Sequence, residues 1–384
     1  MRQWLSLRPF VSVLTGLLAI CHLASGQDTV AVGLVAASGS GRITVSVNSG
    51  KYVLLSGNDT LHRLGADDPL QLRAQRDSVE VKGLHMPRAV VRSARIVSLA
   101  PHGQLSVQTE GKPLRYPDDL SFIPEKGKLK LVNHVMLDHY VAYVVQAEGG
   151  GNNGEEYHRI QAILCRTYAM KNRTRHRSEG YDLCDRQHCQ VYDPARVPTL
   201  SLSTAVASTA GLIIVDRDGR PIDAAYHANC GGQTANSEDV WTRPISYLRS
   251  VRDPYCKNAR SATWSLRVDT AKVAAYMRAE GLLRGTVQPV CIDTKEGRCR
   301  NFKLTDGRMS MMGLRGQLNL RSSWFDMRCE GPEAVFSGRG FGHGVGLCQQ
   351  GAIEMVRRGH DFRQVLGFYY TDTRLVDMHA PKSE

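Results

Sequence analysis

The most regular hydrophobic pattern in the chain begins at Leu137. Apolar residues recur there at the i, i+3, i+4, i+7 and i+8 positions of one helix face: Leu137, Tyr140, Val141, Val144 and Val145. The same spacing places the carboxylate Glu148 next on this buried stripe. The three glycines at 149–151 predict that the helix ends directly after it.

Glu148 is therefore expected in an environment that changes its acidity. Burial and the negative end of the helix dipole would both raise its pKa. A carboxyl group that stays protonated near neutral pH is a candidate general acid. The competing interpretation is structural: Glu148 ends a helix and pairs with Arg166.

A second helix is predicted directly after the glycines. Asn153 is placed as its N-cap, with Glu156 three residues later, which resembles a capping box. Five residues would form its inner face, and Arg166 lies among them: Ile160, Ile163, Leu164, Thr167 and Tyr168.

Strand patterns dominate the first third of the chain. Short β-favouring runs separated by Gly, Asn, Asp and Ser occur at 29–35, 43–47, 52–55, 79–81 and 105–108, with another at 129–132. Further helices are predicted at 200–210, 270–280, 349–358 and 362–370, and a hairpin from 211–215 and 222–227. We expect an α+β fold: a small β-rich N-terminal region at 27–120 and a main domain at 121–384, with a mixed sheet and a few helices.

Residues 1–26 resemble an export signal. Arg2 and Arg8 precede an apolar run from Phe10 to Leu23, and Ala24, Ser25 and Gly26 form a small-residue cleavage site. Cleavage would place the protein in the periplasm or cell envelope and leave it without a membrane anchor. The alternatives are an uncleaved anchor and a lipid anchor at Cys21.

The charge of the chain favours an anionic partner. The net charge is +12, and a polyanionic wall polymer or a lipid surface would suit it. Nucleic acid is disfavoured because no block of Lys and Arg with interleaved aromatics is present and because the chain is expected to be exported. A generally solvated surface is the alternative.

A glycine-rich segment forms the second candidate site. Glycines at 338, 340, 342, 344 and 346 surround His343, and a helix then begins near Gln349. Such a segment is expected to wrap a ligand or another strand. The pattern lacks the Lys-Ser/Thr ending of a phosphate-binding loop. A tight turn around a structurally satisfied histidine is the alternative.

Cysteine spacing indicates a metal site or disulfides. His176, Cys184 and Cys189 are spaced like zinc ligands, with His188 as a further ligand option. Disulfides between Cys184 and Cys189, or between Cys189 and Cys230, compete with this interpretation. Separately, Cys291 and Cys299 flank a turn and are candidates for a local disulfide.

One aromatic residue is a candidate for sugar binding. Trp241 ends a polar loop that begins at Cys230, and an exposed indole could stack on a sugar ring. Burial of Trp241 in a core is equally compatible with the sequence.

Four motifs in the same order resemble the stage II sporulation protein D family, which includes amidase enhancers. They are Arg166-Thr-Tyr-Ala, Tyr181-Asp-Leu-Cys with His-Cys-Gln-Val-Tyr192, Cys230-Gly-Gly-Gln-Thr, and the segment from Gly338 to Ala352. The similarity covers roughly 120 to 375. It implies lytic transglycosylation of peptidoglycan, preferably of glycan strands stripped of stem peptides.

The resemblance also assigns residues. Glu148 matches the catalytic acid, and Arg166, His343 and Gln349 match other functional positions. Tyr168 and Trp241 are added here as substrate-binding candidates. His176, Cys184 and Cys189 resemble zinc ligands of some members, and no cofactor is required for the reaction. The chain departs from the family at 149–154, where members carry Met and a Trp/Pro-containing connector, so substrate preference and rate are open.

The implied chemistry needs one carboxyl group. It protonates the glycosidic oxygen and then deprotonates the muramyl 6-hydroxyl, which closes a 1,6-anhydro ring, whereas hydrolytic glycosidases generally use two carboxylates. The alternatives are a non-catalytic wall-binding protein that stimulates an amidase or serves a division or sporulation complex, and a metal-dependent hydrolase.

Overall fold

The computed structural model describes residues 28–35, 37–149, 153–241, 243–280, 290–292, 301–304 and 307–380, and for 290–309 only the backbone. The predicted export signal at 1–26, Cys299 and the central part of the 149–154 segment lie outside these residues, as does the side chain of Cys291. Among the described helices, none is long and apolar enough to cross a membrane.

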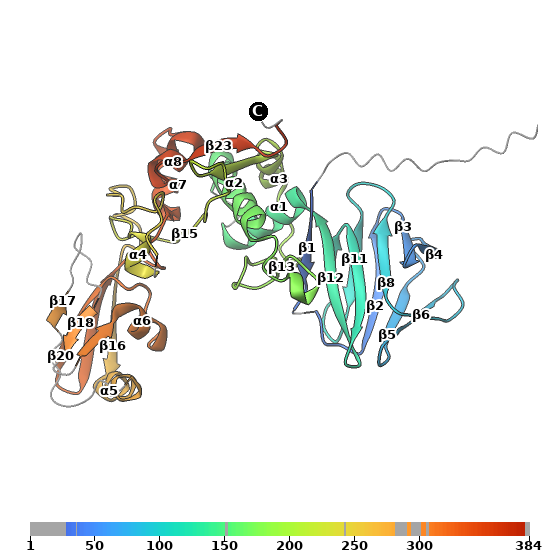
Figure 1. Cartoon of the computed structure of the whole chain (residues 1–384), viewed down its shortest axis with the longest axis horizontal. Coiled ribbons are helices and arrows are strands. Elements are labelled where there is room, and N and C mark those ends of the chain that lie inside the picture. Colours follow the sequence, from blue (N-terminus) through green and yellow to red (C-terminus); the bar gives the residue numbers. More distant parts are fainter. Residues whose placement is uncertain are drawn as a thin grey trace, which may run out of the picture.

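Two large sheets form one end of the molecule (Figure 1). Their strands are β1 Thr29–Gly33, β2 Arg42–Ser49, β3 Tyr52–Ser56, β4 Asp59–Leu64, β5 Leu70–Ala74, β6 Val79–Gly83, β7 Ala89–Val91, β8 Ala94–Ser98, β9 Gln104–Gln108, β10 Leu114–Pro117, β11 Asp119–Glu125, β12 Lys128–Met136 and β13 Leu183–Cys184. The orders are β13-β1-β12-β11-β8-β3-β4 and β10-β9-β2-β5-β6-β7. Alternating residues such as Val45, Val107, Ile96 and Phe122 point inward and share one core.

Helices occupy the centre of the molecule (Figure 1). They are α1 Leu137–Glu148, α2 Glu155–Asn172, α3 Leu200–Ala207, α4 Ser237–Val240, α7 Gln349–Arg357 and α8 Phe362–Tyr369, with the short strands β14 Leu212–Val215, β15 Tyr226–His227, β22 Leu347–Cys348 and β23 Arg374–Asp377. α2 joins two cores: Ala162 and Cys165 pack with the large sheets, whereas Ile160 and Ile163 pack with α7 and α8.

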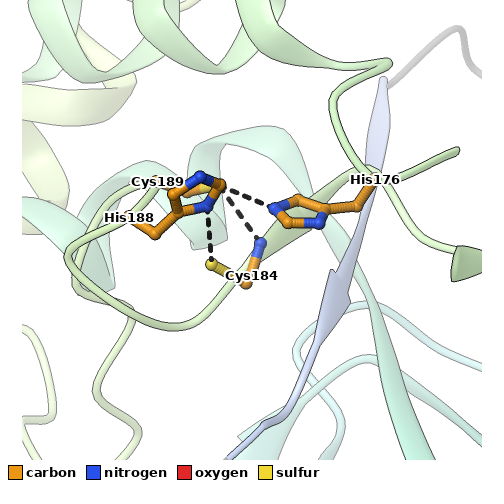
Figure 2. Close-up of side chains that lie close together, drawn as sticks. All are labelled: His176, Cys184, His188 and Cys189. Atoms are coloured by element: carbon orange, nitrogen blue, oxygen red, sulfur yellow. Dashed lines mark hydrogen bonds between the residues drawn. The ribbon is translucent and has the colours of Figure 1, made fainter.

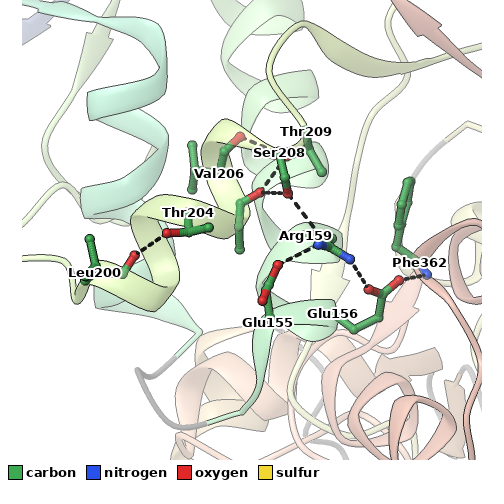
Figure 3. A network of polar contacts seen from close by, with 10 residues as sticks. Glu155, Glu156, Arg159, Leu200, Thr204, Val206, Ser208, Thr209 and Phe362 are labelled. Atoms are coloured by element: carbon green, nitrogen blue, oxygen red, sulfur yellow. Dashed lines mark hydrogen bonds and ion pairs between the residues drawn. The ribbon is translucent and has the colours of Figure 1, made fainter.

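The start of α2 is fixed by polar contacts to two other helices (Figure 3). Arg159 forms ion pairs with Glu155 and Glu156 and donates to Ser208 Oγ at the end of α3, at 3.1 Å. Glu156 also accepts from the backbone amide of Phe362, the first residue of α8, at 2.6 Å. These contacts tie the first turn of α2 to the end of α3 and the start of α8.

An arm projects from the other end (Figure 1). It comprises β16 Thr263–Asp269, α5 Thr270–Ala279, β17 Val290–Ile292, β18 Asn301–Leu304, β19 Gly307–Ser310, α6 Met311–Gln317, β20 Phe325–Glu330 and β21 Glu333–Arg339. A separate hydrophobic cluster that includes Trp264, Leu314 and Phe336 stabilises it. The fold is α+β, as the sequence predicts.

Several local predictions are confirmed and others are wrong. α1 has the predicted bounds and buries all five residues of its predicted stripe. Asn153 does not cap α2, because Gly154 occupies that position and the Asn153 side chain donates to Gly149 O at 2.6 Å. The predicted hairpin is wrong beyond its turn, since β14 pairs with β23 and β15 pairs in parallel with β22. The large sheet also continues past residue 120, through β11 and β12.

Candidate active site

Glu148 lies in the wall of a cleft of about 1020 Å³ between α1, α2 and the β15–β22 pair. The cleft is also lined by residues from five separate parts of the chain, among them Tyr168, Tyr226, Trp241, His343 and Gln349. The structure therefore brings the predicted acid together with all four predicted substrate-binding residues. Their roles stay predictions.

The two oxygens of Glu148 have different partners. Oε1 accepts from the backbone amide of Val191 at 2.8 Å, and Oε2 accepts from the hydroxyl of Tyr226. The amide of Val191 can only donate, whereas the hydroxyl of Tyr226 can also accept. A proton on the carboxyl group is therefore best carried by Oε2, which can then donate to Tyr226. Tyr226 lines the cleft. The oxygen that carries the proton, Oε2, is thus the one on the cleft side of the carboxyl group.

The acidity of Glu148 is strongly altered. Burial raises its pKa from 4.5 to about 7, although the hydrogen bond from Val191 acts in the opposite direction. The carboxyl group is therefore divided between its protonated and ionised forms near neutral pH, as a group that both donates and accepts a proton requires.

The glycine-rich loop packs against the strand that carries Tyr226. Gly340, Gly342, Gly344 and Gly346 all have positive φ. A Cβ at Gly346 would lie 2.1 Å from the carbonyl oxygen of Ala225, so only glycine fits this close approach. The expectation that the loop wraps another strand is confirmed.

The loop also fixes the form of His343. Burial lowers its pKa to about 4, and its Nδ1 accepts from the backbone amide of Val345 at 3.1 Å. The imidazole is thus neutral at pH 7, with its proton on Nε2. Trp241 lies beside it, with ring centroids 5.7 Å apart, and the residue is 38% exposed, so Trp241 is not a core residue.

Arg166 lies elsewhere, which corrects the expectation that it pairs with Glu148. Its guanidinium is fully buried and binds Asp138 Oδ1 through Nη2 at 2.7 Å and Nε at 3.1 Å. It also donates to the carbonyl oxygens of Val206 and Thr209 beside a different cavity, of about 420 Å³. Arg166 therefore joins α1, α2 and α3 and does not line the cleft, and its assignment as a functional position stays a prediction.

Tyr226 and Arg175 line the cleft but were not predicted. Tyr226 lies in a short run with no chemical motif, and its contact with Glu148 depends on the pairing of β15 with β22. Arg175 is exposed and lines the cleft, where it donates to Tyr168 Oη at 2.8 Å and to the carbonyl oxygen of His188 at 2.9 Å. It supplies a positive charge near the acid.

The loop that delivers Val191 contains the predicted metal ligands (Figure 2). Ligand atoms of His176, Cys184, His188 and Cys189 all lie within 4.8 Å of one another. Cys189 Sγ is 3.4 Å from His176 Nε2, and Cys184 Sγ is 3.9 Å from His188 Nδ1. Tetrahedral zinc at about 2.0–2.3 Å from each ligand produces similar separations.

The surroundings of this cluster also suit zinc. His176 Nδ1 contacts Glu179 Oε1 at 2.6 Å, which leaves Nε2 facing the two sulfurs. Such a carboxylate–histidine pair commonly orients a metal-bound imidazole. None of the seven described cysteines forms a disulfide, and Cys230 belongs to a different cluster from Cys189.

Comparison with known proteins supports the motif-based assignment. The family model for stage II sporulation protein (SpoIID) matches residues 125–215, which include α1, α2 and the loop that contains His176, Cys184 and Cys189. The predicted resemblance to the stage II sporulation protein D family is confirmed. The matched segment contains Glu148 but not the glycine-rich loop.

Individual relatives extend this similarity over most of the chain. Stage II sporulation protein D of Bacillus subtilis is 26% identical over 65% of this chain and 77% of its own length. An uncharacterized protein of Brachyspira hyodysenteriae is 28% identical over 71% and 75%. The amidase enhancer of Bacillus subtilis is 22% identical over 57% of this chain and 37% of its own length.

Proposed function

We propose that this protein acts in the cell wall as a lytic transglycosylase that cleaves peptidoglycan glycan strands between MurNAc and GlcNAc. The observation that carries the proposal is Glu148, a carboxyl group with a pKa of about 7 in the wall of a large cleft. The relatives in the sporulation protein D family favour a role in the wall.

Glu148 would act twice in one turnover. Oε2 gives its proton to the glycosidic oxygen as the bond to the muramyl carbon breaks. The resulting carboxylate is stabilised by the hydrogen bonds from Val191 and Tyr226. It then accepts the proton of the muramyl 6-hydroxyl, whose oxygen closes the anhydro ring, so no second protein carboxylate is needed.

The rest of the cleft suits a glycan strand. Trp241 presents an exposed ring face, and His343 carries an Nε2 proton that can donate to a sugar oxygen. Gln349 adds an amide group to the same surface. Arg175 offers a charge to the lactyl carboxylates that strands without stem peptides expose.

A structural zinc ion held by His176, Cys184, His188 and Cys189 is part of this proposal. When bound, it would tie the two ends of the loop together and so hold the Val191 amide against Glu148. The chemistry itself would come from Glu148. Removing the metal with a chelator should therefore reduce the rate while the products remain 1,6-anhydro. Non-anhydro reducing ends from the metal-loaded protein would instead favour a metal-dependent hydrolase.

The decisive test uses purified glycan strands without stem peptides. Wild-type protein should release 1,6-anhydromuramyl products, detected by mass spectrometry, and Glu148→Gln should lower their rate at least about 100-fold. Glu354→Gln is the matched control, because Glu354 pairs with Arg358 on α7 and does not line the cleft. Equal rates for Glu148→Gln and wild type would refute the site.

Stimulation of an amidase is the second candidate, favoured by the match to the amidase enhancer. In that case the wild-type protein would bind glycan strands without cleaving them. An added amidase would then release stem peptides faster in its presence, and Glu148→Gln would stimulate it equally well.

A further inference from the structure

A second group of metal-ligating side chains lies outside the cleft. It consists of Cys230, Asp253, Cys256 and Cys348, whose ligand atoms all lie within 4.8 Å of one another. Cys230 follows β15, Asp253 and Cys256 share a turn three residues apart, and Cys348 ends β22. All four are fully buried, with at most 1% of any residue exposed. None of these four described residues lines the cleft.

The ligand atoms of this cluster already lie close together. Cys230 Sγ lies 3.3 Å from Cys256 Sγ and 3.2 Å from Asp253 Oδ2. Tetrahedral zinc with Zn–S bonds of about 2.3 Å keeps its sulfur ligands about 3.8 Å apart, so a small outward movement would admit the ion. A disulfide between Cys230 and Cys256 would use two of these side chains and leave the thiol of Cys348 and the carboxyl group of Asp253 outside the bridge.

Surrounding donors are aimed at the same atoms. The backbone amides of Cys230 and Gly351 donate to Cys348 Sγ at 3.2 and 3.3 Å. Tyr369 Oη donates to Asp253 Oδ2 at 3.0 Å, and the amide of Tyr255 donates to Oδ1 at 2.8 Å. Amide and hydroxyl donors of this kind orient thiolate and carboxylate ligands and spread their charge.

The cluster is also closed sterically. A Cβ at Gly351 would lie 2.3 Å from Asp253 Oδ2 and 2.2 Å from Tyr369 Oη. Glycine at this position of α7 therefore lets the carboxylate approach Cys348. Three soft thiols and one carboxylate in a closed, buried site suit zinc.

We propose that Cys230, Asp253, Cys256 and Cys348 bind one structural zinc ion. The ion joins the loop after β15, the turn at 253–256 and the start of α7. Gln349 lines the cleft and follows Cys348 directly, so the ion would also hold the start of α7 beside the cleft. It is independent of the His176 cluster and of the proposed activity.

The test is zinc content measured on the full chain purified without chelators. The double variant Cys184→Ser/Cys189→Ser, which lacks the first cluster, should retain one zinc per chain by native mass spectrometry and elemental analysis. X-ray absorption at the zinc edge should show three sulfur ligands and one oxygen ligand. Adding Cys256→Ser should remove this zinc, whereas adding Cys329→Ser, at an exposed cysteine, should not.

Two results would overturn the proposal. One is a double variant that folds, by circular dichroism, and holds no zinc. The other is a disulfide between Cys230 and Cys256, found by peptide mapping of wild-type protein without reduction. If a variant fails to fold, wild-type protein decides by its zinc ligands and thiols. Zinc with three sulfur ligands and one oxygen ligand, together with reduced Cys230, Cys256 and Cys348, supports the site. No zinc, or zinc bound only by two sulfurs and two nitrogens, refutes it.

Discussion

Replacing Glu148 with Gln should stabilise the folded protein at alkaline pH while it removes activity. The amide has the shape of the protonated carboxyl group, keeps an oxygen for the Val191 amide and gives an N–H toward Tyr226. In wild type the folded-state pKa is about 7, above the ordinary 4.5. The unfolded chain therefore releases this proton at lower pH than the folded chain, and folding loses stability as pH rises from 4.5 to 7.

The expected gain depends on pH in a defined way. In the wild type, a pKa raised from 4.5 to about 7 lowers the free energy of unfolding by roughly 3 kcal/mol at pH 8 and roughly 1 kcal/mol at pH 5. Glu148→Gln should regain these amounts. Urea unfolding of wild type and Glu148→Gln at both pH values, followed by circular dichroism, measures the difference. Glu354→Gln serves as the control and should change stability by less than about 0.5 kcal/mol at either pH. A Glu148→Gln protein whose advantage does not grow from pH 5 to pH 8 would show that burial does not raise this pKa.

Other substitutions test the remaining contacts. Tyr226→Phe removes a hydrogen bond that favours the carboxylate, so the pKa of the alkaline limb of the pH–rate profile should rise by about one pH unit, and the rate should fall. An alkaline limb at the wild-type pH would contradict the contact. Gly346→Ala should lower the free energy of unfolding by at least about 2 kcal/mol, because its Cβ would clash with Ala225 O. The control Gly359→Ala, also at positive φ but with nothing within 4 Å, should lower it by about 1 kcal/mol. Equal melting temperatures of the two variants would refute the close approach. Arg166→Met should destabilise the chain by about 3 kcal/mol or more while the surviving folded fraction keeps its turnover rate, and lost turnover at full stability would return Arg166 to the active site.

Local patterns predicted the central elements well. The stripe of α1 fixed its bounds and the position of Glu148, because a helix with one buried face shows a period that neighbouring elements do not alter. The alternating glycines around His343 likewise predicted a close approach to another strand. Both signals depend on residues within about fifteen positions of one another.

Long-range pairing was beyond the reach of these patterns. Tyr226 meets Glu148 only because β15 pairs with β22, which lies 121 positions further along the chain. Arg166 binds Asp138 and the carbonyl oxygen of Val206 in α3, a packing of three helices that no local pattern indicates. The cysteines at 230, 256 and 348 are too far apart in sequence for any ligand spacing to connect them, and the capping prediction at Asn153 failed because Gly154 adopts the N-cap geometry instead.

The arm between β16 and β21 starts and finishes at neighbouring points. Thr263 pairs with Arg339, and the amide of Gly340 donates to Ala262 O at 2.9 Å. The two ends of the arm are therefore one strand spacing apart, and this distance does not depend on how many residues the arm contains. Insertions or deletions in the arm need not displace His343, so homologues are free to vary in the length of the arm while the cleft keeps its geometry.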